Sequence, residues 1–192
     1  MISKRDNIQN NFRCHSGGAE RADTYFEEIG QKYGVQTLAY SYKTAYHKSE
    51  NKVELSEAEY QEGILHVNIA NKTLNKFKIN RYMKLYSRNW FQIKNSEQIF
   101  AISSLIHKDN REFVKGGTGW AVQMAIDNNK EVFLFDQKKD LWFYWDYQVN
   151  KFKIRNEIPI ITATNFAGIG ARIIDEKGII AIENLFQKSF KK

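Results

Sequence analysis

The sequence contains very little cysteine and proline. Among its 192 residues there is one cysteine, Cys14, and one proline, Pro159. A single cysteine excludes an intrachain disulfide and a cysteine-rich metal site. The four histidines show no metal-ligand spacing. We therefore expect no metal, and no sequence motif calls for a cofactor.

Long apolar segments are also missing. No run approaches the roughly 20 apolar residues that a membrane span needs. The polar start, residues 1–6, lacks the apolar core of a signal peptide. We see no low-complexity linker and no repeat of constant period. We expect one domain over residues 1–192, with residues 1–10 as a polar arm, in the cytoplasm (the host cytoplasm if phage-encoded) and without a membrane partner.

The composition can support a globular domain with an anionic partner. Hydrophobic residues make up 42% of the chain, and the net charge is +7. A positive net charge favours anionic binding partners, such as nucleotides, nucleic acid or acidic surfaces. The basic residues are dispersed, and the densest stretch, 72–84, is diluted by apolar residues. That pattern favours a solvated helix surface over a nucleic-acid patch.

Strand-like and helix-like segments alternate along the chain. Strands are expected at 12–14, 35–42, 97–103, 131–136 and within 158–167. Helices are expected at 19–33, after Ser56, at 79–93, after Gly119 and at 178–190. Ser56 and Glu59 form a capping-box signal, and segments 43–55 and 104–115 are expected to be polar loops. The alternation predicts an α/β, three-layer Rossmann-like domain with a mostly parallel sheet.

One segment departs from that alternation. Residues 141–154 are rich in aromatic side chains on both sides of a polar turn near Asn150. This pattern predicts an aromatic β-hairpin insertion. It could cover an edge of the core, form a lid over a binding crevice, or make a dimer contact in a homo-oligomer.

Glycines concentrate in three places. Of the 11 glycines, seven fall in three short segments: Gly17 and Gly18; Gly116, Gly117 and Gly119; Gly168 and Gly170. Ligands bind where the carboxyl ends of parallel strands meet, and a helix start there can hold a phosphate. We expect a phosphate- or nucleotide-binding crevice; ordinary turn glycines are the alternative. There is no Walker sequence and no full dinucleotide fingerprint, so ATP hydrolysis and hydride transfer have no support.

The glycine segments and their neighbours resemble the SLOG superfamily. That superfamily includes Lonely Guy-type phosphoribohydrolases, the DNA-processing protein A and the ligand-sensing domains of Thoeris defence proteins. The likeness is greatest to small phage and bacterial SLOG-like proteins. Residues 167–172 resemble the Ala-Gly-Ile-Gly-Ser-Arg loop, and residues 16–23 the Ser-Gly-Gly-Ala-x-x-Ala-Asp motif. Arg88-Asn89 and residues 116–119 resemble the Arg-Asn helix and the Gly-Gly-Thr-Gly loop.

The order of these motifs differs from the family pattern. The Ala-Gly-Ile-Gly loop comes first in the family, whereas here the first strand, glycine loop and helix would occupy residues 160–190. This looks like a circular permutation, which is tolerated where the old termini lie close together. It predicts that the closing helix ends near the first strand. It also predicts that the strand at 163–167 lies centrally, beside the strand at 12–14.

The resemblance implies a set of ligand-binding residues. Arg88 and Arg172 belong to matched motifs, and guanidinium groups bind phosphate in a forked geometry. Several residues have an ordinary structural role as the alternative: turn formation for Ser16 and Thr118, capping for Asn89, and core packing for Trp120, which could otherwise stack on a base. The full set is Ser16, Gly17, Gly18, Arg21, Asp23, Arg88, Asn89, Gly116, Gly117, Thr118, Gly119, Trp120, Gly168, Gly170 and Arg172.

The family's hydrolase activity is in doubt for this chain. In the phosphoribohydrolases the Gly-Gly-x-Gly-Thr-x-x-Glu loop ends in a catalytic glutamate, and the matching residue here is Gln123. An amide cannot replace that carboxylate. Asp23 and Asp136 are the weak substitutes, with helix-start charge and strand-end solvation as their structural roles.

Three functions stay open. The first is binding of a nucleotide-derived phosphorylated small molecule, as a sensor or sequestering protein. By family analogy, this could be a phage counter-defence protein that binds a nucleotide immune signal. The second is a nucleotide N-glycosidase, phosphoribohydrolase or transferase. The third, less favoured, is a DNA-binding module, which would need a continuous basic face.

Overall fold

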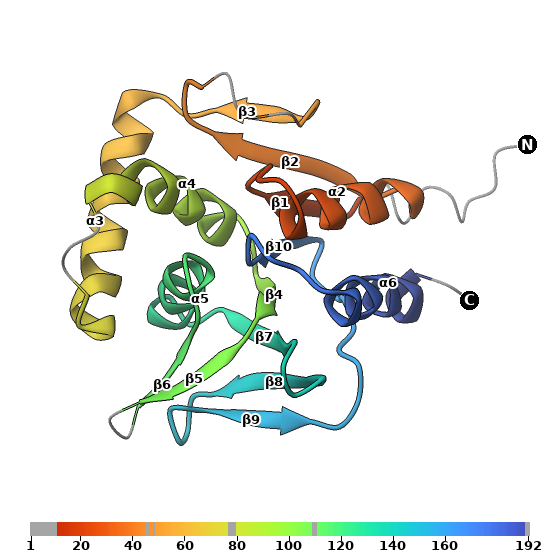
Figure 1. Cartoon of the computed structure of the whole chain (residues 1–192). Helices are drawn as coiled ribbons and strands as arrows, with labels where there is room; N and C mark the ends of the chain where they lie inside the picture. Colours follow the sequence, from red (N-terminus) through yellow and green to blue (C-terminus); the bar gives the residue numbers. More distant parts are fainter. Residues whose placement is uncertain (1–10, 45–46, 48, 77–79, 109–110, 191–192) are drawn as a thin grey trace, which may run out of the picture.

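The protein has a three-layer α/β fold (Figure 1). The computed structural model describes residues 11–44, 47, 49–76, 80–108 and 111–190, so the expected polar arm at 1–10 lies outside the described residues. The main sheet has eight strands in the order β3-β2-β1-β10-β4-β7-β8-β9. Every pairing from β3 to β7 is parallel, and β8 and β9 are antiparallel. The expected fold class is therefore confirmed.

The strands and helices have the following bounds. The strands of the main sheet are β1 Arg13–Ser16, β2 Gln36–Ser41, β3 Lys52–Glu54, β4 Gln98–Ser103, β7 Glu131–Asp136, β8 Leu141–Asp146, β9 Lys151–Arg155 and β10 Asn165–Gly170. The helices are α2 Ala22–Lys32, α3 Glu57–Leu74, α4 Met83–Lys94, α5 Thr118–Asp127 and α6 Glu176–Phe190, with a 3-10 turn, η1 Asn80–Tyr82, before α4. A separate hairpin comprises β5 Leu105–Lys108 and β6 Arg111–Val114.

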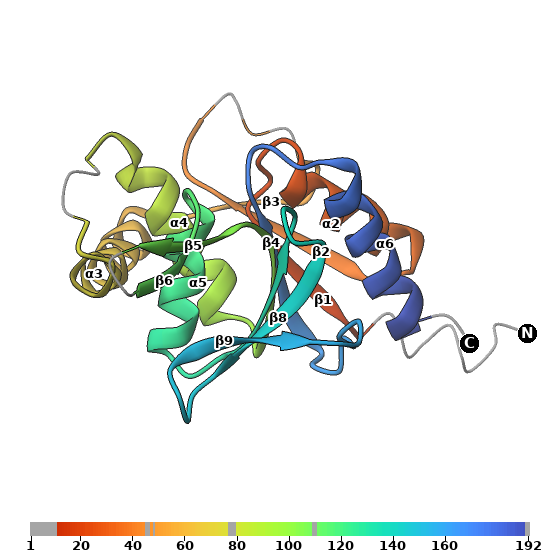
Figure 2. The same ribbon diagram turned by 60° about the horizontal axis from the view of Figure 1, so that its bottom comes forward.

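The helices divide between the two faces of the sheet. α2 and α6 lie side by side on one face, and α3, α4 and α5 lie on the other (Figures 1 and 2). Each face has its own apolar core, in keeping with strands that are buried on both sides. On α6, Ala181, Ile182, Leu185 and Phe186 are buried, whereas Ile180 is exposed. No helix in the described part of the chain is both long and apolar enough to cross a membrane.

Strand β10 lies at the centre of the sheet although it comes near the end of the chain. It pairs in parallel with β1 on one side and β4 on the other. The end of α6 reaches the start of β1, where the Phe12 and Phe190 rings pack edge to face with centroids 5.1 Å apart. Both spatial neighbours that a permuted order predicts are therefore found.

Three expected loops contain strand. β3 forms within 43–55, and β5 and β6 form within 104–115. These are short strands whose charged side chains face outward, so their composition resembles a loop. β10 extends through Gly168 and Gly170, which were expected to form a glycine loop.

The expected aromatic hairpin is present as β8 and β9. It extends the main sheet, because β8 pairs with β7. Trp142, Phe143 and Phe152 are buried in the two cores. The hairpin lies at the opposite end of the strand order from β1 and β2, so it does not form a lid over the turn that follows β1.

Candidate functional site

The predicted ligand residues gather at one edge of the sheet. β1, β10 and β4 run parallel, so their carboxyl ends, at Ser16, Gly170 and Ser103, lie on the same edge. The hairpin β5–β6 leaves this edge and returns to it, because Lys115 bonds back to both Ser103 and Ser104. The turn at Gly116 therefore begins beside the end of β4.

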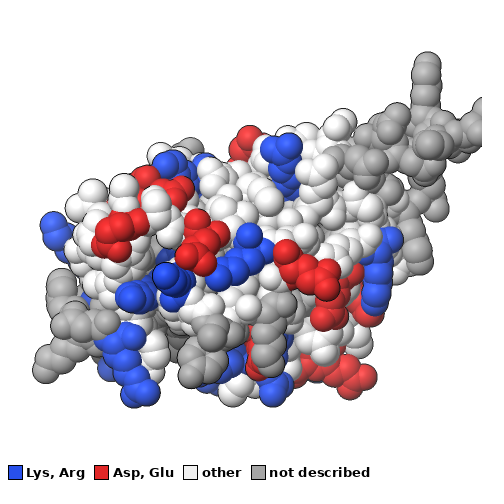
Figure 3. Space-filling view, turned by 90° about the horizontal axis from the view of Figure 1, so that it is seen from above, with Lys and Arg blue, Asp and Glu red and all other residues white. Residues whose placement is uncertain are grey.

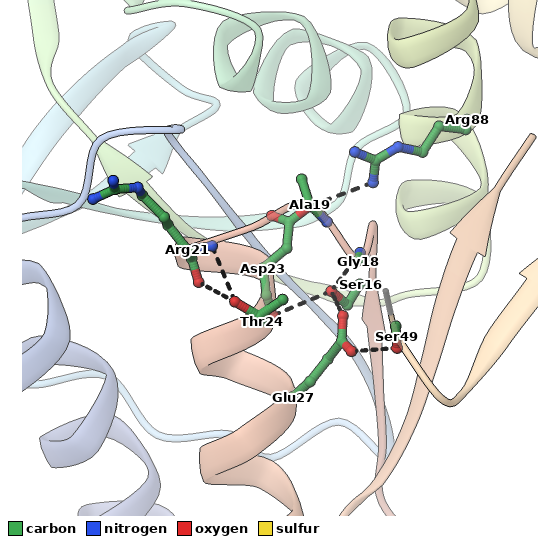
Figure 4. A network of polar contacts seen from close by, with 9 residues as sticks. All are labelled: Ser16, Gly18, Ala19, Arg21, Asp23, Thr24, Glu27, Ser49 and Arg88. Carbon is green, nitrogen blue, oxygen red and sulfur yellow. Dashed lines mark hydrogen bonds and ion pairs between the residues drawn. The ribbon is translucent and has the colours of Figure 1, made fainter. Parts of the chain in front are cut away.

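An arginine lies directly on the glycine turn after β1. A Cβ atom added to Gly17 would stand 1.0 Å from Nη1 of Arg88 and 2.6 Å from Oδ2 of Asp23. The guanidinium occupies the place of the missing side chain and donates to Asp23 at 3.4 Å (Figure 4). Asp23 Oδ2 also accepts from the Ala19 amide at 3.4 Å. Gly17 is thus needed because it lets a buried ion pair form against the backbone.

A second buried carboxylate, Glu27, lies one helical turn beyond Asp23. Its two oxygens accept from the hydroxyls of Ser16 and Ser49, each at 2.6 Å (Figure 4). The Ser16 hydroxyl in turn accepts from the Gly18 amide at 3.3 Å. Charged residues on a helix usually face solvent, but Glu27 is buried. Its spacing of four from Asp23 puts both carboxylates on one face of α2, and this was the available signal.

Burial governs the ionisation of the groups around this turn. It raises the pKa of Asp23; the Arg88 charge acts in the opposite direction, and the Glu27 charge raises the pKa further. The ring of His47 stands against Gly18, where an added Cβ would lie 2.1 Å from Nε2. Burial lowers the pKa of His47, and the charge of Arg88 lowers it further. The cluster therefore contains the carboxyl groups of Asp23 and Glu27 and the guanidinium of Arg88. Beside them lies the His47 imidazole, whose lowered pKa favours the neutral form.

Arg21 stands at the start of α2, on the other side of the turn from Arg88 (Figure 4). Its backbone has φ +90°, a strained conformation for a residue with a side chain. Thr24 stabilises it, because its hydroxyl accepts from the Arg21 amide at 3.0 Å and donates to the Arg21 carbonyl at 2.9 Å. The Arg21 side chain is exposed and is not part of the buried cluster.

A second group of predicted residues lies at the start of α5. Gly116 has φ +69°, and a Cβ there would meet nothing within 4 Å, so its turn is open. Gly117 lies against the ring of Tyr86 on α4, and Thr118 is buried as the first residue of α5. Arg172 is exposed. Burial raises the pKa of the Tyr86 hydroxyl, and the charge of Arg172 lowers it. Helix α4 thus connects both groups, with Arg88 toward β1 and Tyr86 toward α5.

Four predicted ligand residues serve packing instead. Added Cβ atoms at Gly168 and Gly170 would stand 2.2 Å from Phe26 and Ala22 on α2, so these strand glycines let the helix approach. An added Cβ at Gly119 would stand 2.2 Å from the Val114 carbonyl oxygen. Trp120 is buried and donates its indole N–H to Asn71 at 2.7 Å, so it offers no free face to a base. The glycines at these positions are therefore explained by close packing.

The remaining candidates have structural contacts or are simply buried. Asp136 is buried and accepts from the amides of Leu105, Lys138 and Lys139. It anchors the end of β7, and it is not the solvated strand end that was the structural alternative. Gln123 bonds to Asp127 along α5, and Asn89 is buried in α4.

His15 bonds to two neighbouring strands through both of its ring nitrogens. Its two ring nitrogens lie 3.1 Å from the Tyr40 hydroxyl and 3.2 Å from Asn165 Oδ1. Among the residues that the structure describes, no three histidine, cysteine or acidic side chains are grouped to hold a metal ion. Comparison with protein-family models, curated proteins and solved structures finds no match to this chain. The SLOG resemblance therefore rests on the motifs alone.

Proposed function

We propose that this protein binds a nucleotide-derived phosphorylated small molecule at the loop edge of its sheet, as a sensor or a sequestering protein. The observation that carries the proposal is the position of Arg88, whose guanidinium lies on the glycine turn between β1 and α2. A phosphate at this turn would meet backbone amides, the start of a helix and a fixed guanidinium together. The exposed Arg172 and the open turn at Gly116 stand at the same edge.

Phosphate binding at this turn would compete with Asp23. Asp23 already accepts from Arg88 and from the Ala19 amide, so an incoming anion must share both donors with it. Because burial raises the pKa of Asp23, its protonation on ligand binding is accessible. Binding should therefore take up a proton at Asp23, and the affinity for a phosphodiester, whose own charge does not change between pH 8 and 5, should rise as the pH falls through that range.

The direct test is to identify what the protein carries. Purified protein is denatured, and the released small molecules are identified by mass spectrometry; a panel of nucleotides is incubated with the protein in parallel. An intact nucleotide supports sequestration or sensing. Failure to retain or bind any nucleotide of the panel would refute the proposal. The family analogy makes cyclic nucleotide immune signals the first members of that panel.

Arg172 offers a variant test that spares the buried ion pair. Arg172→Ala should weaken binding of the retained nucleotide about tenfold, because a charge-assisted hydrogen bond is lost. Arg13→Ala is the matched control, since Arg13 is also exposed but stands at the opposite end of β1. Equal affinities for the two variants would remove Arg172 from the site.

Catalysis at the same site is the second candidate, and one observation favours it. Asp23 and Glu27 are both buried beside the turn, which supplies the carboxylates that position 123 lacks. Cleavage of an N-glycosidic bond would release free base with time. Glu27→Gln keeps the shape of the side chain and should abolish that release; release at the wild-type rate would exclude Glu27.

DNA binding has less support. It requires a continuous basic face. On the face drawn in Figure 3, acidic and basic side chains are interspersed.

A further inference from the structure

Three aromatic rings form a stack that runs from the core to the surface. The rings of Trp120 and Tyr86 are 4.5 Å apart between centroids, with 17° between their planes. Those of Tyr86 and Tyr82 are 5.8 Å apart, with 27° between their planes. Trp120 is fixed at the inner end by its hydrogen bond to Asn71. The stack therefore holds its outermost ring in a defined orientation.

The outer end of this stack is open to solvent. Tyr86 is 7% exposed and Tyr82 is 43% exposed. Nucleic-acid bases stack on exposed aromatic side chains, so a planar group could extend the stack beyond Tyr82. The stack also borders the glycine turn at the start of α5, because a Cβ on Gly117 would come within 3.0 Å of Tyr86.

Positive charges surround the stack. The guanidinium carbon of Arg81 lies 5.8 Å from the centre of the Tyr82 ring, and Nζ of Lys76 lies 4.8 Å from that of Trp120. Arg172 is also close enough for its charge to lower the pKa of Tyr86, against the effect of burial. An aromatic surface bordered by cations is suited to a molecule that combines a planar ring with phosphate.

We propose that Tyr82 is the stacking platform for the base of the bound nucleotide. The subsite takes a planar purine or pyrimidine ring, which extends the Trp120–Tyr86–Tyr82 stack, while Arg81 and Arg172 lie beside its phosphorylated part. This subsite rests on the proposed function, since it assigns the base of the same ligand whose phosphate the glycine turns take.

The test separates base from phosphate. AMP and ribose 5-phosphate serve as probes in calorimetric titrations of the full-length protein and of Tyr82→Ala. The variant should bind AMP about 5- to 150-fold more weakly, the range expected for loss of one stacked base, and bind ribose 5-phosphate as the wild type does. Tyr82→Phe should keep the AMP affinity. Tyr60→Ala, a partly exposed tyrosine on α3 outside the stack, is the matched control.

Each outcome has a distinct meaning. If Tyr82→Ala binds AMP as tightly as the wild type while Arg172→Ala weakens both probes, the platform is wrong and the proposed function stands. An equal loss for AMP and ribose 5-phosphate in Tyr82→Ala also overturns the platform, because stacking acts on the base alone. If the wild type binds neither probe at millimolar concentration, the platform is overturned, and the nucleotide panel decides the proposed function separately. Circular dichroism confirms that each variant is folded.

Discussion

Substituting Gly17 by alanine tests the central contact of the site. The new methyl group would stand 1.0 Å from Nη1 and 2.2 Å from Cζ of Arg88. The guanidinium lies at the end of a flexible side chain, so it can move away from the methyl group. It then loses its ion pair with Asp23. Alanine itself is compatible with the backbone, since Gly17 is not among the residues with positive φ. The substitution therefore acts on the ion pair.

The expected cost follows from what remains buried. Asp23 would lose its cation while staying enclosed beside Glu27, and removal of one partner of a buried ion pair costs about 3–5 kcal/mol. Protonation of Asp23, whose pKa is already raised, limits that cost. We expect a loss of about 3 kcal/mol at pH 7.5, equivalent to a Tm lower by roughly 6–12 °C for a chain of this size. The loss should shrink near pH 5, as Asp23 takes up its proton.

Urea denaturation followed by tryptophan fluorescence measures this cost at both pH values. Gly116→Ala is the control, because its Cβ meets nothing within 4 Å and only the backbone conformation opposes it, at about 1–2 kcal/mol. Adding Asp23→Asn to Gly17→Ala should recover part of the loss at pH 7.5. The reasoning is refuted if Gly17→Ala costs no more than Gly116→Ala, or if its cost is the same at both pH values.

Three further changes test the packing around the site. Gly168→Ala should destabilise the fold by about 1–3 kcal/mol in urea denaturation, because the methyl group overlaps the ring of Phe26. Trp120→Phe should cost about 1–3 kcal/mol in the same assay, since the Asn71 side-chain oxygen loses its buried donor. Burial lowers the pKa of His15, so this group's contribution to stability is lost as the pH falls below 6.5 toward the folded-state pKa. His15→Asn should flatten that dependence by at most about 1.4 kcal/mol per pH unit; an unchanged slope between pH 7 and 5 would contradict this assignment.

The sheet could be predicted because its strands carry strong local signals. β4 and β7 are continuous apolar runs, and the capping box of α3 forms as expected, with Ser56 and Glu59 bonded to each other's backbone amides. The central position of β10 was also predictable, although it depends on contacts between residues about 150 apart in sequence. That prediction came from motif order and not from periodicity.

The polar contacts of the site could not be predicted in the same way. Arg88 and Asp23 are 65 residues apart, and Glu27 and Ser49 are 22 apart. A charged residue on a helix is outward by default, and the burial of Glu27 depends on the hydroxyls of Ser16 and Ser49, which donate to its two oxygens. Sequence indicates which residue types can bind an anion, but it does not say which of them satisfy one another.

The strand glycines connect the packing of the fold to its site. Gly168 and Gly170 let Phe26 and Ala22 approach β10 closely, and Ala22 is the first residue of α2. Asp23 follows Ala22 directly, so this close approach helps to place its carboxylate, which lies 3.4 Å from Nη1 of Arg88. The Ala-Gly-Ile-Gly segment resembled a ligand loop, yet its physical role is to position a helix whose first turn carries the buried acid. A pattern of glycines beside a ligand site can therefore arise from helix placement, and the anion-binding groups must be sought at the helix start that those glycines position.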